Sequence, residues 1–229
     1  MVQSVPLLTE KHLRDRYNWA VAHQHYTIDD WKRVVWSDET KINRFGSDGC
    51  KWVWKWPGEG LTAHTTCKTV KHGGGNIMVW GCMQHGSGVG SVVRIDGNMD
   101  GELYKQILED DLLGSLDGWD VEKGDIIFQQ DNDPKHKSKK AQKWFQDNSI
   151  RQMVWPAQSP DLNPIEHLWW HLKRKLGGYE TQPKGIEQLW ERIQVEWHAI
   201  PVEVVDNLIE SMPDRVAEVL KQKGGPSGY

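Results

Sequence analysis

The sequence has few cysteines and no long apolar run. Its three cysteines, Cys50, Cys67 and Cys82, cannot all pair within one chain, and so few among 229 residues do not make a disulfide framework. No apolar run approaches the roughly 18 to 20 residues of a membrane span. The start, MVQSVPLLTEKH, has no apolar stretch of the kind found in signal peptides. We therefore expect an intracellular protein with reduced cysteines and no membrane partner.

The chain also has no large excess of charge of either sign. Its net charge of -4, with 38% hydrophobic and 26% charged residues, is typical of a soluble globular protein and argues against indiscriminate coating of nucleic acid. Local patches are not excluded, because KHKSKKAQK at 135–143 carries five lysines. Fourteen tryptophans are far above ordinary usage, and rings of this size usually indicate buried area.

Hydrophobic periodicity predicts antiparallel strands first and alternating strands and helices later, which together describe an α/β protein with a mixed sheet flanked by helices. Thr27 and Asp30 have the spacing of a capping box that opens a short helix. With no internal repeat or low-complexity linker, a single domain is expected. The expected strands cover residues 33–40, 51–56, 76–83, 91–97, 125–131 and 151–155, and the longer helices cover 8–23, 101–113, 139–148, 160–176, 185–198 and 202–222.

Two acids follow the apolar strand in DIIFQQDNDPKH, residues 125–136. Asp131 shares a strand face with Ile127 and Gln129 and lies where the strand ends, at the sheet edge where α/β proteins place ligands. Asp133 precedes Pro134, a pattern that predicts a helix start capped by the aspartate. The sequence thus favours a functional role for Asp131 and a structural role for Asp133.

Two further acids are ambiguous by local pattern. Asn163, Pro164 and Glu166 have the spacing of a capping box, which gives Glu166 a structural explanation. Asp38 ends an apolar strand and is followed by Glu39, which the strand alternation places on the opposite face. Three carboxylates that converged without a neutralising Arg or Lys would repel one another unless cations lay between them. Such oxygen ligands suit Mg²⁺ or Mn²⁺ and in-line phosphoryl transfer.

Several long motifs resemble the catalytic domain of Tc/mariner superfamily DDE transposases. The motifs are WSDET at 36–40, VKHGGGNIMVWGCM at 70–83, FQQDNDPKH at 128–136 and WPAQSPDLNPIEHLW at 155–169. The likeness runs from about residue 7 to the C-terminus and is nearest to the branch with 34 residues between the second and third acids, as between Asp131 and Glu166 here. Long motifs in the right order are far more specific than one short signature.

The resemblance implies a ribonuclease-H-like fold and a nuclear enzyme that cuts both DNA strands at transposon ends. The freed 3′-hydroxyl is then joined to a TA target, and the active complex is a homodimer. Asp38, Asp131 and Glu166 are implied to hold two Mg²⁺ or Mn²⁺ ions, with Asp38 and Asp131 at one and Asp38 and Glu166 at the other. The expected division is a helical lead-in at 1–30, a ribonuclease-H-like core at 31–176 and C-terminal helices at 177–229.

The sequence departs from the family pattern in two places. Family members carry helix-turn-helix modules before the catalytic domain, and this sequence does not contain them. We therefore expect the chain to be an excised fragment or a truncated copy. On its own it is not expected to find transposon ends. Lys137 stands where the family motif usually continues with Thr. A truncated or domesticated protein that binds DNA or a partner without catalysis is the alternative, and a ribonuclease-H-like nuclease with another substrate is less favoured.

Candidate DNA contacts and alternative metal sites complete the predictions. The candidate phosphate contacts beside the acids are Lys135, His136, Lys137, Lys139 and Lys140. If all five lysines of the 135–143 patch touched DNA, log affinity would fall with log salt at a slope of roughly -4 to -5, whereas a solvated helix face would give a flat dependence. Zinc ligands are conceivable among His64, Cys67, His72, Cys82 and His85, but this set has no paired CxxC or HxxxH knuckle. His167 and His171 lie one helical turn apart and could also bind zinc, but the helix between them is Trp-rich and favours packing or solvent contact.

Overall fold

A five-stranded mixed sheet lies at the centre of the protein, in the order β3-β2-β1-β4-β5. We describe residues 8–44 and 75–229 of a computed structural model, and the strand predicted over 51–56 lies outside these ranges. The strands are β1 (Val34–Asn43), β2 (Asn76–Gln84), β3 (Gly88–Ile95), β4 (Ile127–Gln129) and β5 (Arg151–Gln152). The first three are antiparallel neighbours, whereas β1, β4 and β5 are parallel.

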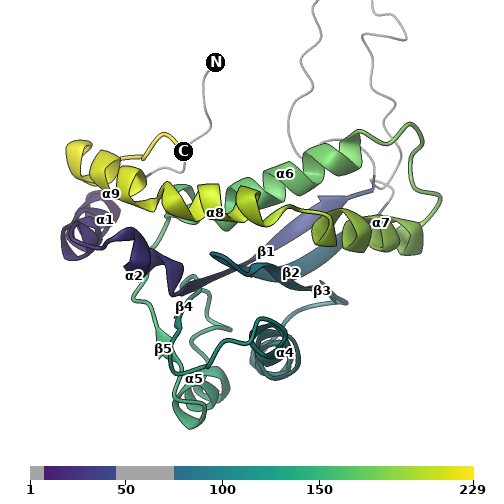
Figure 1. The fold of residues 1–229 in the computed structure, drawn as a ribbon, viewed down its shortest axis with the longest axis horizontal. Helices are drawn as coiled ribbons and strands as arrows, with labels where there is room; N and C mark the ends of the chain where they lie inside the picture. The colour runs from purple at the N-terminus through teal and green to yellow at the C-terminus, as the bar shows by residue number, and fades with distance from the viewer. Residues whose placement is uncertain (1–7, 45–74) are drawn as a thin grey trace, which may run out of the picture.

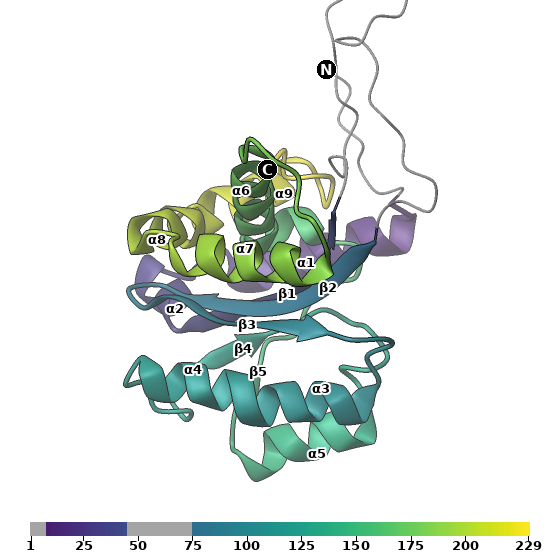
Figure 2. The ribbon, with the colours of Figure 1, turned by 90° about the vertical axis from the view of Figure 1, so that its right-hand side faces the viewer.

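Helices cover both faces of this sheet in three layers (Figures 1 and 2). One face carries α1 (Glu10–His23), α2 (Ile28–Lys32), α6 (Ile165–Gly177), α7 (Ile186–His198), α8 (Val202–Glu210) and α9 (Met212–Lys221). The other carries α3 (Gly101–Ile107), a π-helical stretch η2 (Leu108–Leu112), α4 (Leu113–Gly118) and α5 (Lys139–Asp147). The short 3₁₀ helix η3 (Pro160–Leu162) precedes α6. This is a ribonuclease-H-like α/β fold, as predicted.

Strand alternation in β1 divides its side chains between two hydrophobic cores. Val34 and Trp36 are fully buried against the six-helix face, while Val35 is buried against the α3–α5 face. Large rings are buried on both faces, as their number in the sequence led us to expect, because Trp80 is buried on the α3–α5 face and Trp155 and Trp169 are buried on the other. The same alternation continues into Asp38 and Glu39 and so sends these two acids to opposite faces.

Several elements differ from their predicted extents. β1 continues to Asn43, β3 covers Gly88–Ile95, β5 covers only Arg151–Gln152, and α6 begins at Ile165, after η3. The helix expected to end at residue 113 continues through η2 and α4 to Gly118. The helix expected over 202–222 is two helices, since α8 ends at Glu210 and α9 begins at Met212 with Pro213 in its first turn, where a proline cannot continue the preceding helix. The strand expected over 125–131 pairs only at Ile127–Gln129. The capping box of Thr27 and Asp30 is confirmed, as is the end of α6 at Gly177.

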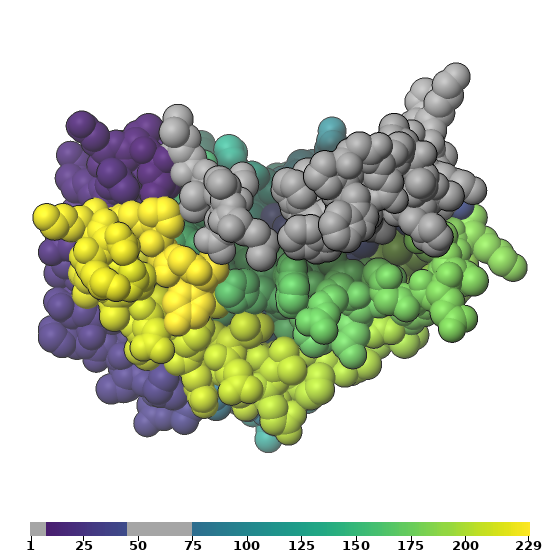
Figure 3. Space-filling view, turned by 90° about the horizontal axis from the view of Figure 1, so that it is seen from above, coloured from purple at the N-terminus to yellow at the C-terminus, as the bar shows by residue number. Residues whose placement is uncertain are grey.

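The C-terminal segment closes onto the N-terminal helix, and Figure 3 shows the yellow C-terminal residues beside the purple α1. Arg16 of α1 is fully buried and donates to the carbonyl oxygens of Gly224 and Gly225 and to both carboxylate oxygens of Asp161. The backbone N–H of Ser227 also donates to Asp161. This network anchors the chain segment that leads into α6. Among the described residues, no helix is both long and apolar enough to cross a membrane.

Candidate active site

Two of the three predicted acids lie close together because β1 and β4 run parallel and their pairing stops just before both acids, although β1 itself continues to Asn43. The last paired residues are Trp36 and Gln129, and the Ser37 hydroxyl donates to the Gln129 carbonyl at 2.8 Å. Asp38 follows two residues after Trp36, and Asp131 follows two residues after Gln129. The pairing of β1 with β4 therefore brings Asp131, just after the end of β4, beside Asp38 in the middle of β1.

The third acid reaches this pair from the first turn of α6. The Asn163 side chain donates to the carbonyl oxygen of Ser37 at 3.3 Å, which fastens the start of α6 to β1 beside Asp38. The capping box predicted for Glu166 is wrong, since the Asn163 N–H donates to the Pro160 carbonyl oxygen and the Glu166 carboxyl lies toward Asp38, although Asn163 Oδ1 does accept from the Ile165 N–H at 3.4 Å. Glu166 is thus directed toward the predicted site.

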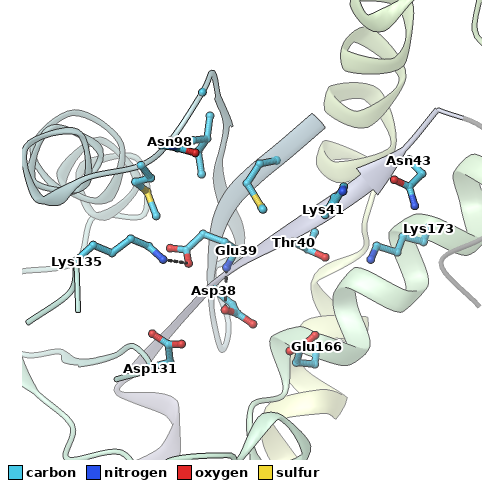
Figure 4. A pocket seen from close by; sticks show the side chains of 14 residues that line it. Asp38, Glu39, Thr40, Lys41, Asn43, Asn98, Asp131, Lys135, Glu166 and Lys173 are labelled. Carbon is cyan, nitrogen blue, oxygen red and sulfur yellow. Dashed lines mark hydrogen bonds and ion pairs between the residues drawn. The ribbon is translucent and has the colours of Figure 1, made fainter. Parts of the chain in front are cut away.

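All three acids line one open cavity of about 810 Å³ (Figure 4). Asp38 lies between Asp131 on one side and Glu166 on the other. Lys135 and Lys173 also line the cavity, so the expectation that the acids have no cation of their own beside them is wrong. The remaining lining residues are Glu39, Thr40, Lys41, Asn43, Met78, Ile95, Gly97, Asn98 and Met99.

The Asp38–Glu166 pair is short of positive charge. Burial, together with the negative charges of Glu166 and Glu39, raises the pKa of Asp38 well above its ordinary value of 3.8. Burial also raises the pKa of Glu166, although its hydrogen bond with Asp38 and the charge of Lys173 act in the opposite direction. The two carboxyls cannot both ionise without a cost in free energy. A divalent cation bound beside them would stabilise their ionised forms.

Asp131 has different surroundings, because its Oδ1 accepts from the His136 ring Nδ1 at 2.6 Å and from the backbone N–H of Asp133 at 2.9 Å. Burial alone would raise the pKa of Asp131, but these hydrogen bonds outweigh it and lower the pKa. His136 also bonds Glu39 Oε1 through Nε2 at 3.1 Å. Burial acts to lower the pKa of His136, and the two carboxylates more than offset that, raising it to about 9.

Asp133 caps a turn and not a helix, which corrects the sequence prediction. Its Oδ1 accepts from the backbone N–H of Lys135 at 3.0 Å, and its Oδ2 contacts Lys135 Nζ at 2.6 Å. The helix begins only at Lys139, and its N-cap is Ser138, whose hydroxyl accepts from the N–H of Ala141. The structural role predicted for Asp133 is confirmed, but the element it supports is the turn that carries His136.

The five predicted DNA contacts differ in their surroundings. His136 has only 3% of its side chain exposed, so we withdraw it from the candidate phosphate contacts. Lys135 pairs with Asp133 and lies 3.4 Å from Glu39, and Lys140 pairs with exposed Glu102. Lys137 and Lys139 are exposed and form no ion pair within the described residues. These two lysines remain the most accessible candidates.

The donor set of the three acids fits Mg²⁺ or Mn²⁺, since hard carboxylate oxygens in an open cavity are the ligands these ions prefer. Among residues 8–44 and 75–229, no group of three or more His, Cys, Asp or Glu side chains has an arrangement that could hold a metal ion as it stands. Asp38 and Glu166 are bonded to each other, and Asp131 to His136.

The alternative zinc sites gain no support from the described residues. Cys82 is buried with its Sγ 3.6 Å from the Ser115 hydroxyl, and His85 bonds Glu210 at 3.0 Å. His167 Nδ1 bonds the Arg215 guanidinium at 3.0 Å, a contact unsuited to a zinc ligand. The other zinc candidates, His64, Cys67 and His72, lie outside the described residues. The 51–56 segment with its tryptophans also lies outside them.

Sequence reasoning missed Glu39 and Tyr104 as parts of this region. The Tyr104 ring lies 4.2 Å from the His136 ring, and its hydroxyl donates to Gln130. The alternation in β1 correctly placed Glu39 opposite Asp38, but it could not show which residue it meets there. Tyr104 lies in α3, and no local pattern links that helix to the turn at 134–137.

Comparison with known proteins gives a consistent result. The model of the family described as DDE superfamily endonuclease matches residues 33–190. The chain is 41% identical over 226 residues to the transposable element Tcb2 transposase of Caenorhabditis briggsae, covering 98% of this chain and 80% of that protein. It is 41% identical over 227 residues to the transposable element Tc1 transposase of Caenorhabditis elegans, with the same two coverages.

Solved structures of the Mos1 transposase share the fold. A Mos1 paired-end complex with the left transposon end superposes with a TM-score of 0.84 at 21% identity, covering 99% of this chain and 66% of that one. The catalytic domain of Mos1 mariner transposase gives a TM-score of 0.74 at 18% identity, covering 97% of this chain and 98% of that one. This chain therefore spans a little under two thirds of the Mos1 chain in the complex and almost all of its catalytic domain.

Proposed function

Because this chain belongs to the DDE superfamily of endonucleases and within it to the Tc/mariner transposases, we propose that it cleaves DNA at transposon ends and transfers the freed strand to a TA target. The observation that carries the proposal is the convergence of Asp38, Asp131 and Glu166 on one open cavity. Relatives at 41% identity are transposases, which supports DNA as the substrate. A homodimer and a nuclear location belong to the same proposal.

Divalent cations are the proposed cofactors, two Mg²⁺ or Mn²⁺ ions shared between Asp38 and Asp131 and between Asp38 and Glu166. Mos1 structures with Mg and with Mn support this choice of metal. When bound, the ions would supply Lewis-acid activation of the attacking oxygen and stabilisation of the leaving oxygen. The three carboxylates would hold them, and ionised Asp38 is the shared ligand.

Other residues of the cavity would position the DNA strand. Lys135 lies beside Glu39 and Asp131 on one side of the acids, and Lys173 of α6 lies on the other (Figure 4). A phosphodiester placed over the acids would have its neighbouring phosphates within reach of cationic side chains on both sides, which fixes register without reading sequence. Lys137 and Lys139 extend the positive surface from the turn into α5.

The test is metal-dependent nicking of duplex DNA that carries the ends of the parent element, compared between wild type and Asp131→Asn. The isosteric change removes one ligand charge, and we expect the nicking rate in Mg²⁺ to fall at least ~100-fold, as for other losses of a charged catalytic group. Asp125→Asn, at an exposed position away from the cavity, is the matched control. Nicking by Asp131→Asn at the wild-type rate would refute the proposed role.

The same assay separates the alternative functions. Binding of the end-containing duplex without any nicking would favour the non-catalytic DNA-binding protein. Cleavage of an RNA–DNA hybrid in preference to transposon-end DNA would favour a nuclease with another substrate. Dependence of strand joining on a TA dinucleotide in the target DNA tests the second step.

A further inference from the structure

Asp131 lies in a segment that gives its carboxylate little backbone support. β4 ends at Gln129, α5 begins at Lys139, and the chain between them forms turns. About half of the Asp131 side chain is exposed, at 51%. An aspartate with two rotatable side-chain bonds in such a segment has no intrinsic reason to keep one orientation. Its orientation therefore depends on the contacts that its carboxylate oxygens make with neighbouring groups.

His136 supplies the main contact. Its Nδ1 lies 2.6 Å from Asp131 Oδ1, and the same oxygen accepts the backbone N–H of Asp133. Both hydrogen bonds fall on Oδ1, while Oδ2 accepts none from the described residues. The carboxylate is therefore held by one oxygen with the other left for a further ligand.

Two further contacts hold the His136 ring, and a third holds its backbone. Its Nε2 bonds Glu39 Oε1 at 3.1 Å, and the ring lies against Tyr104 with centroids 4.2 Å apart. The Gln142 amide donates to the His136 carbonyl oxygen at 3.1 Å, which ties the turn to α5. With 3% of the side chain exposed, the ring has no room to rotate. Glu39 in turn lies 3.4 Å from Lys135 Nζ.

We propose that Glu39 and His136 form a positioning pair that orients the Asp131 carboxylate for cation binding, with Glu39 fixing the His136 ring and His136 fixing Asp131. The inference rests on the proposed function, since it assigns residues that support one of the proposed metal ligands. Neither residue touches the cation in this role. Groups that orient a metal ligand typically change metal affinity 10–100-fold when removed.

The test is Mn²⁺ binding to the whole chain without DNA, followed by the electron paramagnetic resonance signal of free Mn²⁺. We expect His136→Ala to weaken Mn²⁺ affinity about 10–100-fold. His136→Asn should restore most of the affinity, because an Asn amide can donate from near the Nδ1 position. Glu39→Gln should fall between these two, since it keeps the shape but loses the charge that fixes the ring. His198→Ala, at an exposed histidine of α7, is the control and should bind as wild type does.

A second measurement separates positioning from a purely structural role. The nicking rate is measured against Mn²⁺ concentration, and a positioning defect in His136→Asn or Glu39→Gln should raise the concentration needed for half-maximal rate while leaving the maximum nearly unchanged. A structural defect would lower the maximum in proportion to the unfolded fraction, seen by circular dichroism. Should His136→Ala fail to fold, the Asn and Gln variants still decide the question.

The outcomes also distinguish the two proposals. Wild-type affinity in His136→Ala or, if that variant does not fold, in both conservative variants would overturn the positioning role and leave the proposed function standing, provided that Asp131→Asn still loses Mn²⁺ binding. If wild type binds no Mn²⁺, or if Asp131→Asn binds it equally well, the proposed metal site is wrong and the positioning role fails with it.

Discussion

Asp38 is held in surroundings that disfavour its ionised form. Burial and the neighbouring charges of Glu166 and Glu39 raise its pKa well above 3.8. At neutral pH the metal-free protein therefore either keeps a proton on this site or pays an electrostatic penalty for losing it. This arrangement suits an acid whose ionised form is meant to meet a cation, because binding then relieves the penalty.

We predict that Asp38→Asn stabilises the metal-free protein near neutral pH while abolishing nicking. Removing the ionisable group relieves the repulsion, and each kcal/mol relieved should raise Tm by roughly 2–4 °C for a chain of this size. Thermal unfolding in EDTA, followed by circular dichroism, measures the change. Asp125→Asn is the control and should leave Tm unaltered.

The pH dependence of that difference has a defined sign. A raised folded-state pKa means that folded wild type binds more protons than unfolded wild type above about pH 3.8, so its stability falls as pH rises through the folded-state pKa. Asp38→Asn lacks this dependence. The Tm difference between the two proteins should vanish near pH 3 and grow with pH, and a constant difference across the range would contradict the assignment.

Asp161 illustrates the opposite electrostatic situation, a buried pair with full compensation. Burial would raise the pKa of Asp161, but hydrogen bonds from Arg16 and from the Ser227 backbone outweigh it and lower the pKa. We predict that Asp161→Asn lowers the free energy of unfolding by about 3–5 kcal/mol, because it leaves the guanidinium of fully buried Arg16 without its counter-charge. Urea denaturation at pH 7 measures the loss.

The control is an exposed ion pair whose acid is also an aspartate, here with a lysine as its partner. Asp147 contacts Lys143 at 2.7 Å one turn earlier in α5, with both side chains mostly exposed. Asp147→Asn should cost at most about 0.5 kcal/mol, as for other i,i+4 helix pairs. Equal losses in the two variants would show that burial does not set the strength of the Arg16–Asp161 pair.

At the scale of elements, β2 controls how closely α6 and α7 approach the sheet. Gly81 of β2 lies opposite Asp38 of β1, and a Cβ at Gly81 would lie 2.7 Å from the Trp169 ring and 3.0 Å from the Trp197 ring. These two rings are stacked with centroids 4.8 Å apart. The missing side chain is what allows α6, and with it Glu166, to pack close to β1.

We predict that Gly81→Ala destabilises the protein by about 1–3 kcal/mol through overpacking against Trp169 and Trp197. Because α6 carries Glu166, nicking should fall by more than the folded fraction explains. The control is Gly114→Ala in α4, where a new Cβ meets no other atom within 4 Å and helix propensity should increase stability by up to about 1 kcal/mol. Urea denaturation and nicking assays measure both variants, and a Gly81→Ala protein as stable as wild type would exclude this packing limit.

Sequence patterns predicted the elements well where periodicity was long and unbroken, as in α1, β2, α6 and α7. They failed at boundaries decided by tertiary contacts. The capping pattern of Asn163 and Glu166 is real at the level of local propensity, but the Asn163 amide is used to hold β1, and the Glu166 carboxyl meets Asp38. Likewise, Asp133 precedes a proline as helix caps do, yet Ser138 caps α5.

The candidate site itself was predictable only through long motifs and not through single residues. Only Asp131 had a local pattern that favoured function, and the convergence of the three acids depends on the parallel pairing of β1 with β4 and on the anchoring of α6. The supporting contacts of His136 were beyond reach, since they join β1, α3 and a turn. Because His136 was grouped with four lysines as a candidate phosphate contact, its side chain was expected to be exposed. Its hydrogen bonds to neighbouring acids favour a buried position instead.

At the scale of the whole molecule, DNA binding must overcome an unfavourable net charge. The chain carries -4 overall, so attraction to a polyanion depends on where lysines lie and not on their number. Near the cavity, Lys135 and Lys140 are already paired with Asp133 and Glu102. DNA binding by the five-lysine patch is therefore expected to release fewer counterions than the number of its lysines suggests. A lysine that is already paired with a carboxylate only exchanges that carboxylate for a phosphate.

We predict that Lys137 and Lys139 account for about two of the phosphate contacts beside the cavity. The double variant Lys137→Gln/Lys139→Gln should reduce the magnitude of the slope of log affinity against log salt by about 1.8, that is about 0.9 per contact. The control double variant Lys221→Gln/Lys223→Gln, at the end of α9, loses the same net charge away from the cavity and should leave the slope nearly unchanged. Fluorescence anisotropy of a short duplex between 50 and 200 mM salt, the range over which such slopes are resolved, measures both. Equal changes in the two double variants would show that net charge, and not a local contact surface, governs binding.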